Sequence, residues 1–188
     1  MITRESVTAG ILAGGRAVRL GGIDKAWHVY RGHALIVRTR QALAGQVRSL
    51  LVSANRNQER HRALGVQPVA DRLGGAIGPL AGLDALFDAC PTPWLVTVPV
   101  DLACIPDDLV ARLAGGGAPN GAVARDRDGV QPLVALWPVE RASALLTEVL
   151  ADGQRSAWSL LRRLGPVEVD FSELHFGNLN RPEDFDDA

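Results

Sequence analysis

The chain alternates short apolar runs with longer segments in which apolar residues recur every three or four positions. The run that begins at Val7 and the runs at 48–55 and 94–101 have the length and composition of strands buried on both faces of a sheet. A further run at 66–71 contains a proline, which predicts a short or edge-like strand. Buried strands that alternate with helices are typical of an α/β fold with a largely parallel sheet.

The segments between these runs carry helical spacing and helix-end signals, including a proline at 79 and a glycine at 153. The alternation breaks at 122–137, which is typical of two strands joined by a turn at Asp128-Gly129. A last strand is expected at 166–171, a terminal helical turn after it, and a surface loop at 115–121. The predicted helices span 34–47, 58–65, 79–90, 106–114, 138–153 and 156–165.

Composition places the chain among ordinary globular proteins. Its 188 residues are 47% hydrophobic and 22% charged, which fits one domain over residues 1–188. The formal net charge of −1 gives no overall field that would attract nucleic acid or anionic lipid, so neither is an expected partner. No stretch reaches the roughly 18 apolar residues that span a bilayer, and the first residues lack the apolar core of a secretory signal. These features predict a cytoplasmic protein.

Cysteine and histidine give no sign of a structural metal site. Cys90 and Cys104 lack the paired spacing of zinc ligands and do not form a disulfide framework. The four histidines form no cluster at ligand spacing, so each is expected to lie at the surface or to cap an element. They are His28, His33, His61 and His175.

The residues from Leu12 to Lys25 read LAGGRAVRLGGIDK and follow the first predicted strand. Two glycine pairs let successive backbone N–H groups line a concavity, and three cations can hold negative charge. The pattern favours a grip for nucleotide phosphates, with a surface loop of incidental charges as the alternative. It is not a Walker A motif, because Lys25 lacks a preceding glycine and a following serine or threonine. The cations are Arg16, Arg19 and Lys25.

This loop and five later motifs, in the expected order over nearly the whole chain, resemble the molybdenum cofactor guanylyltransferases. The later motifs are SANRNQE, GPLAG, VPVD followed by IP, GVQPLVAL and NLNRPEDF. The family is a branch of the nucleotidyltransferases that activate small molecules with nucleoside triphosphates. The resemblance implies a Rossmann-like three-layer α/β/α sandwich with a mostly parallel central sheet and an antiparallel insertion.

The implied reaction transfers GMP from GTP to the phosphate of molybdopterin and releases pyrophosphate, with Mg²⁺ as cofactor. GTP and molybdopterin are then the substrates, and molybdoenzymes or other cofactor-biosynthesis proteins are expected to make transient contacts. Because the attacking phosphate already carries negative charge, catalysis needs positioning and charge stabilisation rather than a general base.

The resemblance gives three residues catalytic roles. Asp101, at the end of the run 94–101, is implied to be the Mg²⁺ ligand, whereas the sequence alone leaves helix capping as an equal alternative. Arg19 and Lys25 are implied to stabilise the triphosphate and the charged transition state. Asp71 is implied to face nucleotide or metal, with an Asx turn as its alternative.

Two binding sets follow from the same resemblance. Asn178 and Asn180 match the family's NxN pair on the acceptor side, although asparagines alone are usually turn or cap residues, and Arg155 lies where the family has basic character near the pterin. The molybdopterin-binding set is therefore Arg155, Asn178 and Asn180. The GTP-binding set is Leu12, Ala13, Gly14, Gly15, Lys25, Ser53, Asn55, Asp71, Gly78, Pro79, Leu80, Gly82 and Asp101.

Three places depart from the family pattern. Ser53 stands where an asparagine is often found, so the contact to base or ribose is expected to change, while Asn55 is retained. Leu102-Ala103 replace a small polar residue and a proline, and Arg181 replaces a threonine that would cap the last helix. These changes concern local geometry rather than the fold.

Other functions share part of the pattern. A cytidylyltransferase or a sugar-phosphate nucleotidylyltransferase would have the same first loop and Asp101, but the GGxDK loop and the NxNRPED tail favour the molybdopterin branch. A catalytically silent nucleotide- or cofactor-binding adaptor would keep the fold alone. The joint presence of Arg19, Lys25 and Asp101 argues against such an adaptor.

Overall fold

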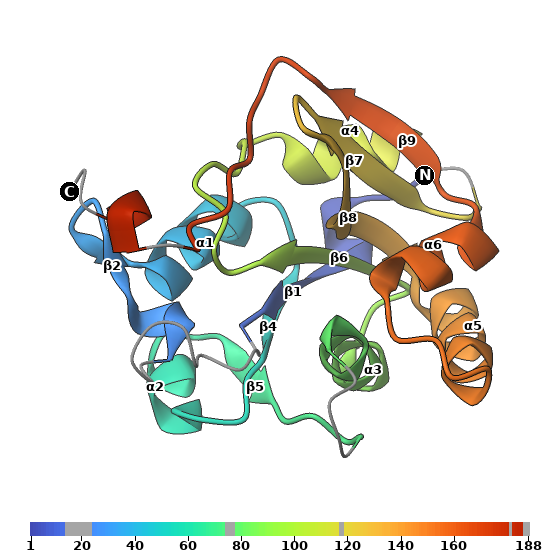
Figure 1. Cartoon of the computed structure of the whole chain (residues 1–188), viewed down its shortest axis with the longest axis horizontal. Helices are drawn as coiled ribbons and strands as arrows, with labels where there is room; N and C mark the ends of the chain where they lie inside the picture. The colour runs from blue at the N-terminus through green and yellow to red at the C-terminus, as the bar shows by residue number, and fades with distance from the viewer. Residues whose placement is uncertain (14–23, 74–77, 117–118, 181, 186–188) are drawn as a thin grey trace.

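The computed structural model describes residues 1–13, 24–73, 78–116, 119–180 and 182–185 (Figure 1). At its centre is a seven-stranded sheet with helices on both faces, so the predicted three-layer α/β architecture is confirmed. In spatial order the strands are β5 (Gln67–Val69), β4 (Ser49–Ser53), β1 (Val7–Leu12), β6 (Trp94–Pro99), β8 (Gly129–Pro138), β7 (Ala122–Asp126) and β9 (Val167–Phe171).

The strands β5, β4, β1 and β6 all run in the same direction, so their carboxyl ends lie at the same edge of the sheet. β1 pairs in parallel with both β4 and β6, β4 pairs in parallel with β5, and β7 pairs in parallel with β9. β8 is antiparallel to both of its neighbours and is the predicted antiparallel insertion. It lies inside the sheet, where it joins the β5-β4-β1-β6 half to the β7-β9 half. β5 is a three-residue edge strand, as its proline predicts.

The helices form two layers that cover opposite faces of the sheet (Figure 1). One layer contains α3 (Pro79–Ala89), α5 (Val139–Ala151) and α6 (Ala157–Leu164), and the other contains α1 (Leu35–Ala44) and α4 (Leu109–Gly116). Smaller elements are α2 (Gln58–Ala63), the 3-10 helices η1 (Arg4–Ser6), η3 (Lys25–Trp27) and η4 (Pro182–Phe185), and a hairpin of β2 (Val29–Tyr30) and β3 (His33–Ala34). No helix among the described residues is long and apolar enough to cross a membrane.

Alternate side chains along the strands point to opposite faces of the sheet and pack into two hydrophobic cores. In β6, Val96 and Val98 pack into the core beneath α1 and α4, while Leu95 packs into the core beneath α3 and α5. Trp137 of β8 is fully buried in the second core and meets the ring of Phe87 edge to face, with centroids 5.9 Å apart. A strand buried on both faces reads as a continuous apolar run, which is the pattern that predicted it.

The surface loop expected at 115–121 is wrong for its first two residues, because Gly115 and Gly116 belong to the last turn of α4. A Cβ atom at Gly116 would lie 2.5 Å from a methyl carbon of Val169 in β9. Glycine therefore lets the end of α4 approach the sheet closely, a long-range packing requirement that a local glycine run does not reveal.

The expectation that every histidine is a surface or capping residue is wrong for His61. Its side chain is 0% exposed and packs against the ring of Trp27, with centroids 5.1 Å apart. Neither ring nitrogen has a hydrogen-bond partner among the described residues. The charged sequence of α2 conceals an inward-facing position on a six-residue helix. His61 therefore acts as a small aromatic core residue beneath η3.

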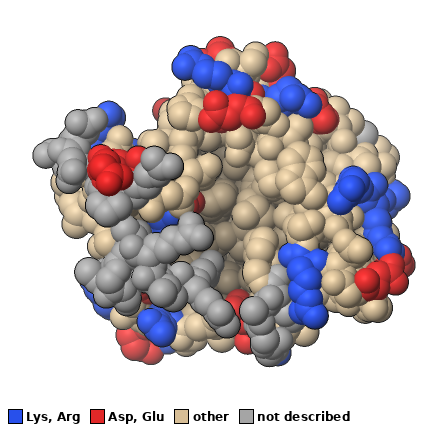
Figure 2. Space-filling model, viewed as in Figure 1, with Lys and Arg blue, Asp and Glu red and all other residues tan. Residues whose placement is uncertain are grey.

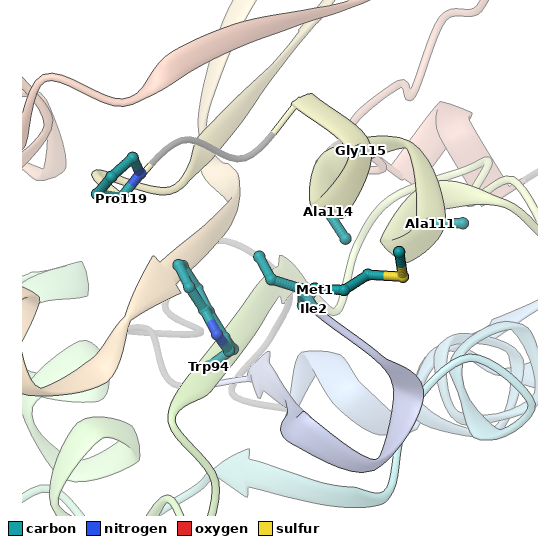
Figure 3. Close-up of a pocket in the computed structure, with 7 residues that line it drawn as sticks. All are labelled: Met1, Ile2, Trp94, Ala111, Ala114, Gly115 and Pro119. Carbon is teal, nitrogen blue, oxygen red and sulfur yellow. The ribbon is translucent and has the colours of Figure 1, made fainter.

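A pocket of about 610 Å³ lies at the amino end of β6, at the edge of the sheet opposite Asp101 (Figure 3). Figure 3 shows Met1 and Ile2 between Trp94 and the alanines of α4. Its lining residues carry no side-chain carboxylate, ammonium or guanidinium. They are Met1, Ile2, Trp94, Ala111, Ala114, Gly115 and Pro119.

The burial of His61 predicts a pH-dependent contribution to stability. Burial lowers the pKa of His61 below its ordinary value of 6.5, Arg60 lowers it further, and the nearby Asp24 carboxylate opposes the shift. Between the lowered pKa and 6.5 the unfolded chain binds more protons, so the stability of the folded protein falls as pH drops below 6.5. His61→Phe removes this loss, and the pH dependence of urea unfolding between about pH 7.5 and 5 should become weaker.

His33→Gln, which changes an exposed imidazole, is the matched control and should keep the wild-type pH dependence. At about pH 7.5, His61→Phe leaves no hydrogen-bond partner unsatisfied and should unfold within about 1.5 kcal/mol of wild type. An unchanged pH profile in His61→Phe would show that His61 titrates alike in both states.

Candidate functional site

The carboxyl ends of the parallel strands meet at one edge of the sheet, and most of the predicted site residues lie there. Leu12 ends β1 and pairs in register with Ser53 at the end of β4 and with Pro99 at the end of β6. Asp101 follows β6 by two residues. Crevices outside the carboxyl ends of strands are where open α/β sheets bind ligands. In Figure 2 the middle of the visible face is recessed and mostly uncharged, with charged side chains toward its margin.

Lys25, Asp101 and Asn180 form the centre of the site. The Lys25 ammonium donates to Asp101 Oδ2 at 2.5 Å and to Asn180 Oδ1 at 2.6 Å. The side chains of Lys25 and Asp101 are 22% and 16% exposed, so solvent and ligands can still reach them. The fold thus brings together a predicted catalytic cation, the predicted metal ligand and a predicted acceptor contact, from positions up to 155 residues apart.

Asp101 sits on a loop that is held from two sides. From α1, Thr39 Oγ1 donates to the Val100 carbonyl at 3.3 Å and Arg38 donates to the Ala103 carbonyl at 2.9 Å. From the C-terminal segment, Leu179 N donates to the Asp101 carbonyl at 2.9 Å. These backbone contacts leave the Asp101 carboxylate to side-chain and ligand chemistry, which does not fit the helix-cap alternative.

The C-terminal segment enters the site as an extra extended piece. Ala103 N donates to the Gly177 carbonyl at 3.1 Å, and Asn178 forms an isolated antiparallel bridge with Leu102. The Asn180 amide nitrogen lies 3.5 Å from the Asn178 carbonyl, and its backbone N–H donates to Asp184 at 2.7 Å. Asn178 and Asn180 therefore take their place from backbone pairing with the Asp101 loop.

A second cluster joins Ser53, Asn55 and Asp71 at the ends of β4 and β5. Asn55 donates to Asp71 Oδ2 at 2.8 Å and accepts from the Asp71 backbone N–H at 2.9 Å, while Ser53 Oγ lies 3.2 Å from Asp71 Oδ1. Ser53 is 1% exposed, whereas Asn55 is exposed. Ser53 therefore orients the Asp71 carboxylate from below, and Asn55 fixes it from the solvent side.

Helix α3 starts beside this cluster because two of its glycines allow close contact. Gly78 precedes Pro79 at φ +65° and ψ −144°, a conformation that side chains rarely adopt. A Cβ atom on Gly82 would lie 2.8 Å from Ser53 Oγ and 2.9 Å from a methyl carbon of Leu12. The motif GPLAG thus turns the chain and seats α3 on the ends of β1 and β4, with Leu80 fully buried.

Arg155 is exposed and directly precedes Ser156, whose hydroxyl caps α6 by accepting from Ser159 N. Its carbonyl oxygen lies 3.8 Å from the position that a Cβ atom on Gly78 would take. The start of α6 therefore adjoins the start of α3. Arg155 lies on the α3 side of the site, and its backbone, rather than its guanidinium, makes this contact.

Several predicted residues lie outside the described residues. They comprise the centre of the glycine-rich loop and one position in the C-terminal segment, namely Gly14, Gly15, Arg16, Arg19 and Arg181. Ala13, the last described residue before that loop, donates its N–H to the Ser53 carbonyl at 3.3 Å.

The donor set at the strand edge fits a magnesium ion that shares its ligands with a substrate. Among the described residues, no group of three or more His, Cys, Asp or Glu side chains could hold a metal ion alone. The single carboxylate of Asp101 remains partly exposed at the strand edge. Mg²⁺ is commonly held by one or two carboxylates together with substrate phosphates and water, so this site suits a cation that arrives with a nucleotide.

The sequence did not point to a buried carboxylate that holds the C-terminal segment beside the site. Asp126, at the end of β7, is 3% exposed and accepts from Phe176 N, Asp128 N and the Gln131 amide at 2.8–3.0 Å. Burial raises the pKa of Asp126, but these hydrogen bonds outweigh it and hold that pKa below its ordinary value. Asp126 thereby ties the β7–β8 turn to the segment that leads to Asn178. The one sequence signal was an acidic residue at the end of an apolar run.

Comparison with known proteins identifies the family. The model of the MobA-like NTP transferase domain matches residues 9–168. The chain is 38% identical to the molybdenum cofactor guanylyltransferase of Cupriavidus necator over 96% of this chain and 94% of that protein. It is 40% identical to the protein of the same name from Bordetella petrii over 92% and 91%. The chain belongs to the molybdenum cofactor guanylyltransferase family.

Solved structures with low sequence identity share the fold. The molybdopterin-guanine dinucleotide biosynthesis protein A of Archaeoglobus fulgidus matches with a TM-score of 0.68 at 19% identity, covering 95% of this chain and 94% of that one. The 2-C-methyl-D-erythritol 4-phosphate cytidylyltransferase of Thermus thermophilus matches with a TM-score of 0.66 at 16% identity, covering 94% of each chain. The predicted fold type and family are both confirmed, and nucleotidyltransferase chemistry follows from the family.

The geometry at Gly78 predicts a strong side-chain penalty there. Gly78→Ala forces a Cβ into a conformation reserved for glycine and should lower the free energy of unfolding by about 1–3 kcal/mol. Gly45→Ala is the control, because Gly45 has an ordinary φ of −77° and open space around it. This second change should leave stability unchanged or raise it by up to about 1 kcal/mol in urea unfolding. Equal stability of the two variants would contradict the role of Gly78.

Proposed function

We propose that this protein transfers GMP from GTP to the phosphate of molybdopterin and releases pyrophosphate, forming the guanine dinucleotide form of the molybdenum cofactor. The observation that carries the proposal is the contact of Lys25 with both Asp101 and Asn180 at the carboxyl edge of the sheet. That contact joins a nucleotide-side cation to an acceptor-side amide. The names of the 36–40% identical relatives support the choice of nucleotide and acceptor.

The reaction needs no proton transfer to or from the protein. An oxygen of the acceptor phosphate forms a bond to the α-phosphorus of GTP, the bond from that phosphorus to the β-phosphate oxygen breaks, and the electron pair leaves with pyrophosphate. The described site fits this demand, since its contributions are charge and position. Lys25 stabilises negative charge on the phosphates, and Asn180 holds the Lys25 ammonium in place.

Asp101 is the residue that would hold Mg²⁺. When bound, the ion would supply positive charge that offsets the negative charge developing on the phosphates during transfer. The carboxylate already holds a cation, the Lys25 ammonium, at the end of β6. Arg19 would add a second positive charge from the glycine-rich loop.

The Ser53–Asn55–Asp71 cluster and the start of α3 form the nucleotide side. Asp71 is fixed by two asparagine contacts and by Ser53, which suits a carboxylate that accepts hydrogen bonds from a ribose or a base. The GPLAG backbone lies against the same cluster. The departure at Ser53 keeps a hydrogen bond to Asp71, and the Ser53 side chain packs closely against Gly82.

The acceptor side would be formed by Asn178, Asn180 and Arg155. The two asparagines lie next to Asp101, and Arg155 lies next to the start of α3. A guanidinium suits an anionic group on the pterin substrate. We further propose that the protein works in the cytoplasm, with transient contacts to the molybdoenzymes that receive the product.

The test of the function is pyrophosphate release by purified protein with Mg²⁺ and molybdopterin, with GTP, CTP, ATP and UTP offered separately. Release with GTP supports the guanylyl assignment. Release with CTP alone would move the protein to the cytidylyltransferases, and Mg-GTP binding without turnover would favour the silent adaptor.

Removing the charge of Asp101 should abolish Mg²⁺-dependent turnover. In Asp101→Asn the side chain keeps its size and its backbone contacts, so the circular dichroism spectrum should match wild type. Asp88→Asn is the control, because Asp88 forms an exposed ion pair with Arg72 on the outer side of α3. A near wild-type rate in Asp101→Asn would remove this carboxylate from the mechanism.

Lys25 should not tolerate replacement, even by arginine. Lys25→Ala should lower kcat by more than tenfold, the size of a lost charge contact of roughly 1.4 kcal/mol. Arginine keeps the charge, but its planar fork cannot place one compact donor between Asp101 and Asn180. Single-turnover rates that are equal for Lys25→Arg and wild type would show that only the charge matters.

A further inference from the structure

Asn57 has an unusual backbone for which the proposed function gives no reason. It precedes α2 at φ +53° and ψ +29°, one of two non-glycine residues with positive φ among the described residues. Asparagine tolerates this conformation better than most residues, but a cost remains. Strain of this kind persists where the surrounding structure enforces it, and it is frequent at functional sites.

The side chain of Asn57 does not cap α2, the helix that it precedes. Residues at the start of a helix usually accept a hydrogen bond from a nearby backbone N–H, but the Asn57 side chain makes no such bond. Its amide instead donates to Asp24 Oδ2 at 2.8 Å, across 33 residues of chain. The left-handed backbone thus coincides with a side chain that reaches away from α2 and toward η3.

Asp24 links Asn57 to the turn that carries Lys25. The second oxygen, Asp24 Oδ1, accepts from Ala26 N at 3.1 Å and so caps η3, the single turn that begins at Lys25. Both carboxylate oxygens therefore have defined partners, one on η3 and one before α2. A side chain that caps a turn fixes the backbone at the first residue of that turn. The Asp24 cap therefore restricts the direction in which the Lys25 side chain can extend.

A ring stack fastens α2 to the other end of η3. The Arg60 guanidinium lies 3.7 Å from the centroid of the Trp27 ring, and Trp27 packs on the buried His61. Contacts thus flank Lys25 on both sides: Asp24 before it bonds to Asn57, the residue that precedes α2, and Trp27 after it packs on α2. The ammonium of Lys25 then extends to Asp101 and Asn180 on the opposite side.

We propose that Asn57 is a positioning residue that holds Lys25 in place through its hydrogen bond to Asp24. The inference rests on the proposed function for its kinetic consequence and on the described contacts for the rest. Asn55 and Asn57, two residues apart, have parallel tasks, since Asn55 fixes Asp71 and Asn57 fixes Asp24. The short segment between β4 and α2 thereby sets both the nucleotide side and the catalytic cation.

Two variants separate position from charge. Asn57→Gly removes the amide but accepts the positive φ without strain. The exchange Asp24→Asn with Asn57→Asp rebuilds the contact with reversed polarity, because the oxygen of the new amide can accept from Ala26 N while its nitrogen donates to the new carboxylate. Arg31→Gly is the control, because Arg31 is the other non-glycine residue with positive φ among the described residues and lies outside this network.

The first readout is steady-state kinetics with Mg-GTP and molybdopterin. Asn57→Gly should lower kcat about tenfold or more, since small misplacements of a catalytic group are costly, while the melting temperature stays within a few degrees of wild type. The exchange variant should regain most of the lost kcat. Arg31→Gly should keep the wild-type rate.

The second readout does not need catalysis, because Lys25 is the only lysine in the chain. Acetylation by N-hydroxysuccinimidyl acetate, followed at Lys25 by peptide mass spectrometry, reports how firmly its amine is held by Asp101 and Asn180. Acetylation should be several-fold faster in Asn57→Gly than in wild type and should return toward the wild-type rate in the exchange variant.

Wild-type acetylation and kcat in Asn57→Gly would overturn the proposal, as would faster acetylation without any loss of kcat. An exchange variant as impaired as Asn57→Gly in both readouts would also overturn it, because Asp24 would then act through its charge. If wild type transfers no GMP while acetylation follows the expected order, the proposed function fails and the positioning contact stands.

Discussion

Parallel pairing of β1 with β4 on one side and β6 on the other is the constraint on which the site depends. The register places the last residue of β1 opposite the last residues of both neighbours. The loops that follow these three strands therefore begin side by side at the same edge of the sheet. Asp101, Ser53 and the start of the glycine-rich loop are neighbours because backbone hydrogen bonds align three strand ends, not because these side chains attract one another.

The central ion pair is held weakly enough to be exchanged. Lys25 and Asp101 are both partly exposed, and pairs in such surroundings contribute roughly 0–1 kcal/mol to stability. Under the proposed function, a nucleotide with its cation would supply a partner for each member, phosphate for Lys25 and metal for Asp101. The pair therefore keeps two opposite charges close together in the free protein without opposing the ligands proposed for them.

The fold was predictable from the sequence because buried strands and amphipathic helices leave local patterns. The runs at 48–55 and 94–101 became β4 and β6, and the proline-containing run became the edge strand β5. Features that depend on contact between distant segments were not predictable. Position 116 requires glycine because Val169 lies against it, and His61 is buried in a contact with Trp27.

The candidate site divides along the same line. Motif resemblance pointed to Lys25, Asp101 and Asn180, but not to the fact that one ammonium contacts both other side chains. Asp24 lies in the motif LAGGRAVRLGGIDK and Asn57 in the motif SANRNQE, but the resemblance gave neither residue a role. Their contact spans separate motifs and depends on one positive φ angle, for which a single asparagine in the sequence is an insufficient signal.

The order of the chain also sets the order in which the site is completed. Asn178 and Asn180 follow every strand of the sheet, yet Asn178 pairs with the loop at the end of β6 and Asn180 accepts a hydrogen bond from Lys25. Synthesis runs from the amino terminus, so the strands leave the ribosome before these two asparagines do. Until this segment has been synthesised, the Asp101 loop lacks its antiparallel partner, so the site is completed only by the last part of the chain.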